Sequence, residues 1–180
     1  MRADRQQAVL NAALALVDAG LPVTISALTA RSGVSNGSIY HHFGSRAGVF
    51  EALYGDSFAH CVAAMTPALA LGDTEKVVRG VVVRYLDWVA ENPGRARFLY
   101  AAPLTADPVA KAAAFAPIAQ WFAARAAEGS VRPFPLWALD PVVMGPAHEC
   151  ARRYLLGVLD LAEARDPVAD AVWGVVAPLG

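Results

Sequence analysis

Apolar residues recur at helical spacing along most of the chain, and the first such stripe lies between Asp4 and Ala19. Apolar side chains at positions 9, 10, 13, 14, 16 and 17 fall on one side of a helix. Gly20 can end that helix in a left-handed conformation, and Pro22 follows just beyond it. The pattern therefore predicts a first helix over residues 4–19.

Residues 24–43 predict two short helices joined by a tight turn. Their inner faces follow three- and four-residue spacing: Ile25, Leu28 and Thr29 in the first helix, and Ile39, Tyr40 and Phe43 in the second. In the turn, Gly33 can take a positive φ, Val34 can fill the gap between the helices, and Ser35 is a good N-cap. This is the pattern of a helix-turn-helix, whose second helix lies in the major groove when it binds DNA.

Further helix starts follow along the rest of the chain. Ser45 can cap a fourth helix that runs to about Thr66–Pro67, and Asp73 can open a fifth that continues to Val89. Four later pairs each place a good N-cap before a proline, whose φ is already helical: Asn92-Pro93, Asp107-Pro108, Asp140-Pro141 and Asp166-Pro167. They predict helices over about 93–101, 108–127, 141–163 and 167–177, with a kink at Pro146.

The patterning as a whole predicts an all-α fold of about nine helices. Three of them form a helix-turn-helix domain in residues 1–50, and six form a bundle in residues 51–180. The β-branched alternation that marks strands is scarce, and alanine, which favours helix, is abundant.

The helix-turn-helix residues resemble the N-terminal signature of the TetR (tetracycline-repressor) family of bacterial regulators. The resemblance covers about the first 55 residues and rests on Thr24, Leu28, Thr29, Ser32, Gly33, Val34, Ser35, Gly37, Tyr40, His42, Phe43, Arg46 and Val49. Thr29 and Ser32 stand where alanines are usual, Arg46 replaces a common lysine, and Val49 replaces leucine. The resemblance implies an N-terminal DNA-binding domain followed by a helical domain for ligand binding and dimerisation.

Charge and cysteine content agree with such a regulator. Residues 1–50 carry four arginines and two aspartates, a net charge of +2, whereas the whole chain has −1. A modest basic end on a mildly acidic body suits a protein that binds DNA through one small module. Cys61 and Cys150 form neither a metal-ligand spacing nor a disulfide framework, and we expect no cofactor and two reduced thiols in a cytoplasmic protein.

A membrane or exported protein is not expected. Arginines precede the apolar stretch at residues 8–17 as they do in a signal peptide, but Asn11 interrupts that stretch and its helical periodicity indicates a mature helix. The chain has no run of 18 apolar residues, so we predict no transmembrane segment.

DNA recognition is expected from residues 35–42. Asn36 and Ser38 can hydrogen-bond to base edges in the first turn, and Gly37 would let the backbone approach the DNA. The candidate phosphate donors are Thr24, Ser35, Tyr40, His41 and Arg46. By resemblance, Tyr40 and His42 are usual contacts to the DNA backbone. The alternatives are a purely core role for Tyr40 and a packing or capping role for His42, and Phe43 is expected in the core.

A twofold dimer is expected because one such unit covers too little DNA to be specific. The two recognition helices would lie about 34–36 Å apart on a palindromic double-stranded operator. Wide apolar faces make the last two helices the candidate dimer interface, with Arg152, Leu155, Leu156, Leu159, Val168, Val172 and Trp173. The alternative for some of these residues is packing within one chain.

The middle helices hold bulky residues that could line a small-molecule pocket: Trp88, Phe98, Phe115, Trp121, Phe122, Met144 and His148. Aromatic residues at helical spacing are also what a core needs, and His148 could equally be a satisfied core histidine. The family resemblance implies an inducer pocket in this region, whose occupation moves the fourth helix and separates the two DNA-reading helices. The ligand would be small and mostly apolar or aromatic.

Two other classes of protein compete with this interpretation. An enzyme is disfavoured because the chain has no HExxH, no G-x-S-x-G and no phosphate-binding glycine loop, and the adjacent His148, Glu149 and Cys150 fan to different faces of a helix. A helical interaction module that kept the helix-turn-helix but lost DNA binding is supported by the low positive charge of residues 1–50. The sequence favours a dimeric repressor released by a small hydrophobic ligand, with repression resting on the resemblance alone.

Overall fold

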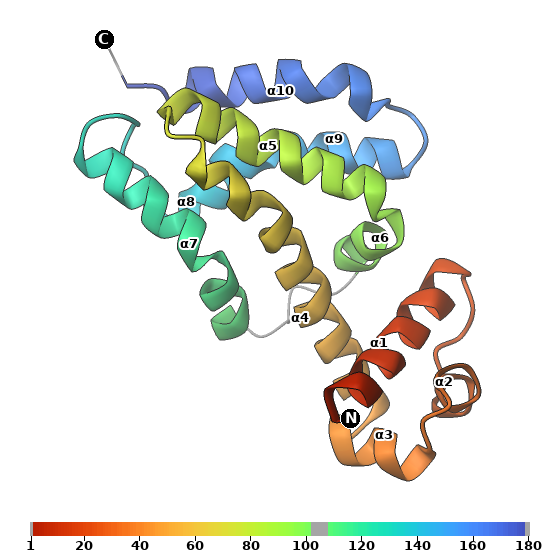
Figure 1. Cartoon of the computed structure of the whole chain (residues 1–180). Coiled ribbons are helices and arrows are strands. Elements are labelled where there is room, and N and C mark those ends of the chain that lie inside the picture. Colours follow the sequence, from red (N-terminus) through yellow and green to blue (C-terminus); the bar gives the residue numbers. More distant parts are fainter. Residues whose placement is uncertain (1, 102–107, 179–180) are drawn as a thin grey trace. The chain divides into compact units, whose positions relative to one another are not determined.

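A computed structural model describes residues 2–101 and 108–178, and every regular element in these ranges is a helix (Figure 1). The α-helices are α1 (Arg2–Asp18), α2 (Ile25–Ser32), α3 (Asn36–Phe43), α4 (Arg46–Met65), α5 (Thr74–Glu91), α6 (Pro93–Ala101), α7 (Pro108–Ala127), α8 (Leu136–Leu139), α9 (Gly145–Leu155) and α10 (Leu161–Val176). A 3₁₀ turn, η1 (Thr66–Ala70), continues α4, and a π turn, η2 (Asp140–Met144), joins α8 to α9. The described residues therefore contain nine separate helical segments, and the predicted all-α fold is confirmed.

The predicted helix ends are confirmed over the first half of the chain. The first helix ends before Gly20, which has a φ of 64°, and the second ends before Gly33, with a φ of 71°. Asp73 begins α5 by accepting a hydrogen bond from the Lys76 amide at 2.9 Å. Asn92 acts differently from the prediction, because its side-chain amide donates to the Trp88 carbonyl at 3.0 Å and so closes α5. The predicted cap at Asp107 lies outside the described residues.

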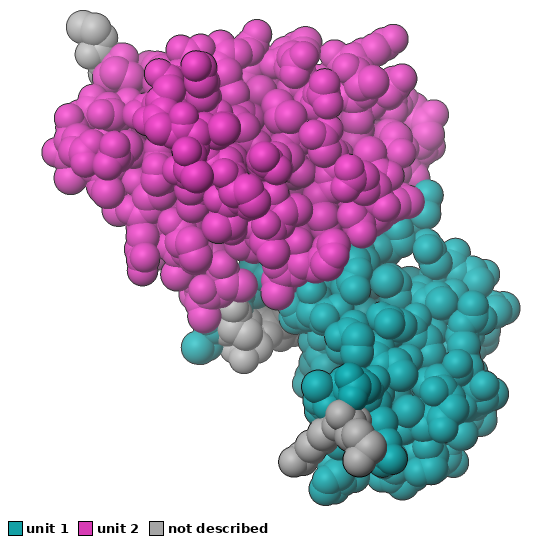
Figure 2. All heavy atoms as spheres, viewed as in Figure 1, with its two compact units in different colours: residues 1–58, 94–111 teal, residues 59–93, 112–180 magenta. Residues whose placement is uncertain are grey.

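The chain divides into two compact units, which Figure 2 colours separately. Unit 1 comprises residues 1–58 and 94–111, and unit 2 comprises residues 59–93 and 112–180. Unit 1 thus includes α6 and the first part of α4 in addition to the helix-turn-helix. The functional division into residues 1–50 and 51–180 stays a prediction.

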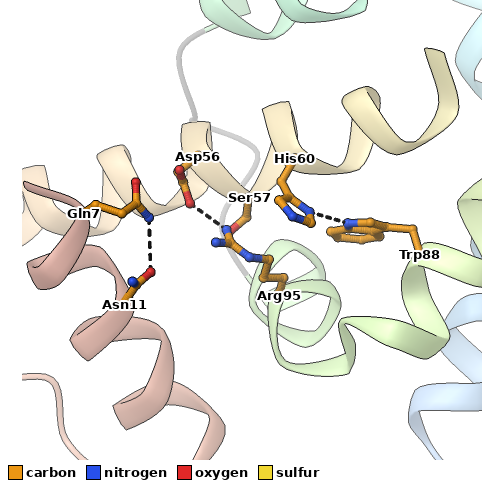
Figure 3. A network of polar contacts seen from close by, with 7 residues as sticks. All are labelled: Gln7, Asn11, Asp56, Ser57, His60, Trp88 and Arg95. Atoms are coloured by element: carbon orange, nitrogen blue, oxygen red, sulfur yellow. Dashed lines mark hydrogen bonds and ion pairs between the residues drawn. The ribbon is translucent and has the colours of Figure 1, made fainter. Parts of the chain in front are cut away.

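Unit 1 has its own hydrophobic core beneath the helix-turn-helix. Its fully buried members come from four helices: Val9, Ala13, Leu28, Ile39, Val49 and Leu53. Phe98 of α6 belongs to the same core and its ring stacks on Phe50 of α4, with 6.0 Å between the ring centroids. Arg95 ties α6 to α4, since its Nη1 donates to Asp56 at 2.6 Å and to the Ser57 hydroxyl at 3.0 Å (Figure 3).

Unit 2 is organised around α5. The buried residues of this helix are Val77, Val78, Val81, Val82, Tyr85, Leu86, Trp88 and Val89. α10 packs along α5, and α9 contacts both of them, as the upper part of Figure 1 shows. Two buried sides on one helix explain why apolar residues occupy more than a single stripe of α5.

The predicted bounds of the last two helices, 141–163 and 167–177, are wrong. Helical structure already begins at Leu136, and α9 ends before Gly157, whose φ is 75°. Asp160, rather than Asp166, begins the last helix by accepting from the Ala162 amide at 2.9 Å, so Pro167 lies inside α10. A proline in the second turn removes one backbone hydrogen bond, a loss that the packing of α10 on α5 offsets.

Pro146 also differs from its prediction. It lies in the first turn of α9 rather than at a kink within a longer helix, directly after the π turn η2. A proline ring normally meets the carbonyl four residues before it, and the wider five-residue turn accommodates it. Asp140, predicted to begin a helix, instead lies within this continuous helical run and faces His148, with 3.9 Å between Oδ1 and Nε2.

Candidate nucleic-acid interface

Helix α3 is short, and both of its ends are closed locally. At its start, the Ser35 hydroxyl accepts from the Ser38 amide at 3.3 Å, as an N-cap does. At its end, Gly44 has a φ of 70° and donates its amide to the Tyr40 carbonyl at 2.8 Å. Ile39 is completely buried and anchors the helix from beneath. The opposite face of α3 is therefore turned outward.

The turn before α3 is closed by the side chain of Ser32. The Ser32 hydroxyl donates to the Leu28 carbonyl at 2.6 Å and accepts from the Val34 amide at 3.1 Å. Val34 is buried between the two helices, as predicted, and the Gly33 amide donates to the Thr29 carbonyl at 3.0 Å. These contacts determine where α3 begins relative to α2.

The structure gathers the predicted DNA-binding residues on unit 1, at α3 and at the starts of α2 and α4. The exposed members are Thr24, Ser35, Asn36, Gly37, Tyr40, His41 and Arg46, and the partly buried members are Ser38 and His42. The Tyr40 side chain is 52% exposed, so a purely core role for this residue is wrong. Phe43 packs against the core of unit 1, as expected.

Thr24 combines two roles. Its hydroxyl accepts from the Ala27 amide at 3.1 Å and begins α2, and it also lies 3.0 Å from the Ser26 hydroxyl. A capping hydroxyl still has its own hydrogen to donate, so capping does not prevent a phosphate contact.

The start of α4 presents Arg46 beside the end of α3. Ser45 begins the helix by accepting from the Gly48 amide at 3.0 Å. Gly48 is required there, because a Cβ at this position would lie 1.9 Å from the Phe43 carbonyl oxygen. The Arg46 guanidinium lies 5.9 Å from the centre of the Phe50 ring, where a cation–π contact can orient it. Ser45 and Arg46 thus form a helix start with a cation, a geometry suited to a phosphate.

An open groove of about 430 Å³ lies between α1 and the turn that precedes α3. It is lined by Asp4, Arg5, Ala8, Ser32, Gly33, Val34, Ser35 and Ser38. Arg5 adds a cation beside two of the predicted DNA-binding serines, and sequence reasoning missed it. No sequence signal marks this position, because its place depends on how α1 packs against the turn.

The residues of the predicted ligand pocket are divided between the two units. Trp88, Phe122 and Met144 are buried in unit 2, and Phe115, Trp121 and His148 are partly buried there. Phe98 belongs to the core of unit 1 instead. A small cavity of about 90 Å³ in unit 2 is lined by Phe122 together with Ala119, Ala123, Ala126, Arg132, Phe134, Leu136 and Leu139.

Trp88 belongs to an aromatic cluster in unit 2 that the sequence pattern only partly revealed. Its indole N–H donates to Nδ1 of His60 at 2.8 Å (Figure 3). The Tyr85 ring stacks on Trp88, with 6.5 Å between the ring centroids, and is tilted against the His148 ring at 5.1 Å. His60 lies 28 residues before Trp88, so helical spacing could not connect the two. The cluster combines large apolar surfaces with a few polar groups.

The predicted dimer residues differ in exposure. Leu156 is 65% exposed, and Leu155, Leu159, Val168 and Trp173 are partly buried. Val172 is completely buried within its own unit, so packing inside one chain is the correct alternative for this residue.

The exposed Arg152 donates to Glu149 at 2.8 and 2.9 Å, and hydrogen bonds from Arg152 and Arg153 lower the pKa of the Glu149 carboxyl to about 2.

Both cysteines are unpaired thiols in the structure. Burial raises the pKa of Cys61 to about 12, and burial also raises the pKa of the partly buried Cys150.

Among the described residues, no cluster of histidine, cysteine and acidic side chains could hold a metal ion. None of the helices formed by these residues is long and apolar enough to cross a membrane.

A comparison with known protein families gives one match, in the N-terminal part of the chain. Residues 9–53 match the model of the family described as bacterial regulatory proteins, tetR family. No curated protein sequence matches the chain significantly.

Solved structures match over nearly the whole chain at low identity. A putative tetR family transcription regulator from Shewanella sp. PV-4 shares 21% identity and a TM-score of 0.80, with 97% of this chain and 99% of that chain covered. A TetR family transcription regulator from Marinobacter aquaeolei VT8 shares 17% identity and a TM-score of 0.79, with 98% and 97% covered. FadR from Bacillus subtilis, solved in complex with stearoyl-CoA, shares 11% identity and a TM-score of 0.75, with 92% and 96% covered.

Proposed function

We propose that this chain, whose residues 9–53 belong to the tetR family of bacterial regulatory proteins and whose fold is that of solved TetR-family regulators, is a site-specific, non-enzymatic regulator of transcription in the bacterial cytoplasm. It acts as a homodimeric repressor on a palindromic operator and is released by a small hydrophobic ligand.

The outward face of α3 is the observation that carries this proposal. It presents hydroxyl, amide and imidazole groups, while its single fully buried residue, Ile39, anchors the helix to the core. Tyr40 and Arg46 extend the polar surface from the first turn toward the end of α3 and the start of α4, and both can donate to phosphates that flank a major groove. A helix that reads DNA is expected to carry exposed polar donors that do not take part in packing the core.

Dimerisation is supported by exposed apolar residues near the end of the chain. Leu156, Val158 and Val175 are all exposed, and Trp173 is only partly buried. Apolar side chains of this size are enriched where a partner covers them. Two copies related by a twofold axis would place two α3 helices about 34–36 Å apart, one turn of DNA.

A hydrophobic ligand is supported by the aromatic cluster of unit 2 and by one structural neighbour. FadR from Bacillus subtilis was solved with stearoyl-CoA, a molecule with a long apolar chain. Pockets for drug-sized ligands have volumes of about 300–1,000 Å³, whereas the cavity beside Phe122 has about 90 Å³. Ligand binding would therefore displace buried side chains, and this displacement would supply the conformational signal.

Fluorescence anisotropy on the DNA upstream of its own gene, with random duplex as the control, tests the proposal. Each neutralised phosphate contributes a slope of about −0.9 to the dependence of log affinity on log salt concentration. We expect tight binding that prefers the upstream DNA and weakens at least about tenfold between 50 and 200 mM salt. Equal and weak binding to both duplexes, and to a library of random duplexes, would contradict a site-specific regulator.

Two variants separate DNA binding from an interaction module that merely keeps the fold. Tyr40→Phe removes one hydroxyl donor, and Arg46→Ala removes one charge and should reduce the salt slope by about 1. Arg84→Ala removes a charge from an exposed position of α5 and is the matched control. Unchanged DNA affinity in both variants, with normal circular dichroism spectra, would favour the interaction module.

A further inference from the structure

A side chain of α2 holds the first residue of α3. The Thr29 hydroxyl donates to the side-chain carbonyl oxygen of Asn36 at 2.5 Å, across the turn that joins the two helices. Thr29 is partly buried near the end of α2, and its backbone carbonyl receives the amide of Gly33 at 3.0 Å. Asn36 itself is exposed. The partly buried Thr29 therefore orients Asn36, which lies on the exposed surface of α3.

The bond changes what Asn36 can offer to DNA. A free asparagine amide pairs with adenine through two bonds, because its oxygen accepts from N6 and its nitrogen donates to N7. In this chain Thr29 occupies one of the two lone pairs of that oxygen and turns the oxygen toward α2, so the NH₂ group, which only donates, is the end of the amide directed away from Thr29. Guanine presents two adjacent acceptors in the major groove, O6 and N7, and no donor there.

Threonine is well suited to hold the amide in one orientation. Its β-branched side chain has few rotamers, so little freedom is lost when the hydroxyl points at Asn36. Serine would offer the same hydroxyl with more freedom, and valine would keep the shape without the hydrogen bond. These two residues provide a matched pair of substitutions.

We infer that Thr29 is a specificity-determining positioning residue: by holding the carbonyl end of the Asn36 amide, it makes Asn36 select guanine over adenine at the base pair that it faces. The inference rests on the proposed function, because it takes the first turn of α3 to lie in the major groove. Thr29 touches no base itself and acts through Asn36.

The test begins with selection of binding sites from a randomised duplex library by the wild-type protein. Asn36→Ala identifies the base pair that Asn36 faces, as the position where the preference of the wild type is lost. Affinities for the selected site and for its guanine-to-adenine counterpart are then compared among the wild type, Thr29→Val and Thr29→Ser. We expect Thr29→Val to reduce the guanine-over-adenine ratio about tenfold, and Thr29→Ser to retain most of it.

The double variant Thr29→Val, Asn36→Ala separates positioning from a general structural role. If Thr29 acts through Asn36, adding Thr29→Val to Asn36→Ala leaves the base preference unchanged. Equal weakening by Thr29→Val on every sequence, with no change in preference at the Asn36 position, would overturn the inference while leaving the proposed function intact. A wild-type protein that enriches no sequence at all would overturn the proposed function and the inference with it.

Discussion

Helices α3 and α5 are held in place by different forces. α5 has 18 residues and buries eight side chains, among them Tyr85, Leu86 and Trp88. α3 has eight residues and fully buries one side chain, Ile39, with its ends closed by Ser35 and Gly44. Burial of a large apolar side chain contributes roughly 1.5–3 kcal/mol, and an N-cap contributes about 1 kcal/mol.

The difference shows what a binding helix gives up. A helix of eight residues is unstable by itself in water, so α3 depends on its caps and on the core beneath Ile39. In return, most of its side chains are available to a partner. α5, by contrast, is packed by α10 and α9, so most of its apolar side chains are buried and not available to a partner.

Truncation of a core residue in α5 has the largest expected effect. Leu86 is completely buried, and Leu86→Ala should lower the free energy of unfolding by about 2–5 kcal/mol, through lost burial and the cavity left behind. Urea denaturation followed by circular dichroism measures this loss. Arg84→Ala, at an exposed position of the same helix, should change it by less than about 0.5 kcal/mol. Equal effects of the two substitutions would contradict the assignment of α5 to the core.

The same contrast explains how much of the fold the sequence could predict. The bounds of α2 and α3 were predictable because their signals are local: Thr24, Gly33, Ser35 and Gly44 lie within two residues of the ends they determine. The all-α fold and the number of helical segments followed from such signals repeated along the chain.

The last helices could not be delimited in this way. Asp166-Pro167 and Asp160 both offer a cap, and the choice of Asp160 depends on the packing of α10 against α5, which is a tertiary effect. A π turn at residues 140–144 has no local signature comparable to a cap. Gly157 ends α9 with a positive φ, and this local signal was not used in the prediction.

The candidate site also combines features that are local in sequence with features that are not. The exposed polar residues of α3 were predictable because the helical spacing of Ile39 and Phe43 shows which face is buried. The position of Arg5 and the bond between Thr29 and Asn36 depend on contacts between helices. The aromatic cluster in unit 2 was predicted only in part, since His60 reaches Trp88 from a different helix.

Removal of the cap of α3 has a smaller expected effect than truncation in α5. Ser35→Ala leaves the Ser38 amide without its acceptor and should cost about 0.5–2 kcal/mol of stability. Ser35→Gly should cost only a few tenths of a kcal/mol, and it serves as the control that removes the same side chain. Amide hydrogen exchange would localise the loss to α3. A loss of protection spread evenly over both units would show that α3 is not stabilised separately.

Gly37→Ala has the smallest expected effect on stability and separates stability from binding most clearly. A Cβ at Gly37 meets no atom within 4 Å, and alanine favours helix over glycine by roughly 0.5–1 kcal/mol. The variant should therefore be slightly more stable than the wild type in urea denaturation. If the backbone of the first turn approaches the DNA, the added methyl group should nevertheless weaken operator binding about tenfold, or ~1.4 kcal/mol.

Gly55→Ala is the matched control, because Gly55 is also exposed within a helix, α4, and a Cβ at this position would meet no atom within 4 Å. It should stabilise the protein to a similar extent and leave the DNA affinity unchanged. Opposite changes in stability and affinity for Gly37→Ala, but not for Gly55→Ala, would mean that glycine is retained in α3 for the approach of DNA, at the expense of the helix. Equal affinities would instead place the first turn of α3 away from the groove.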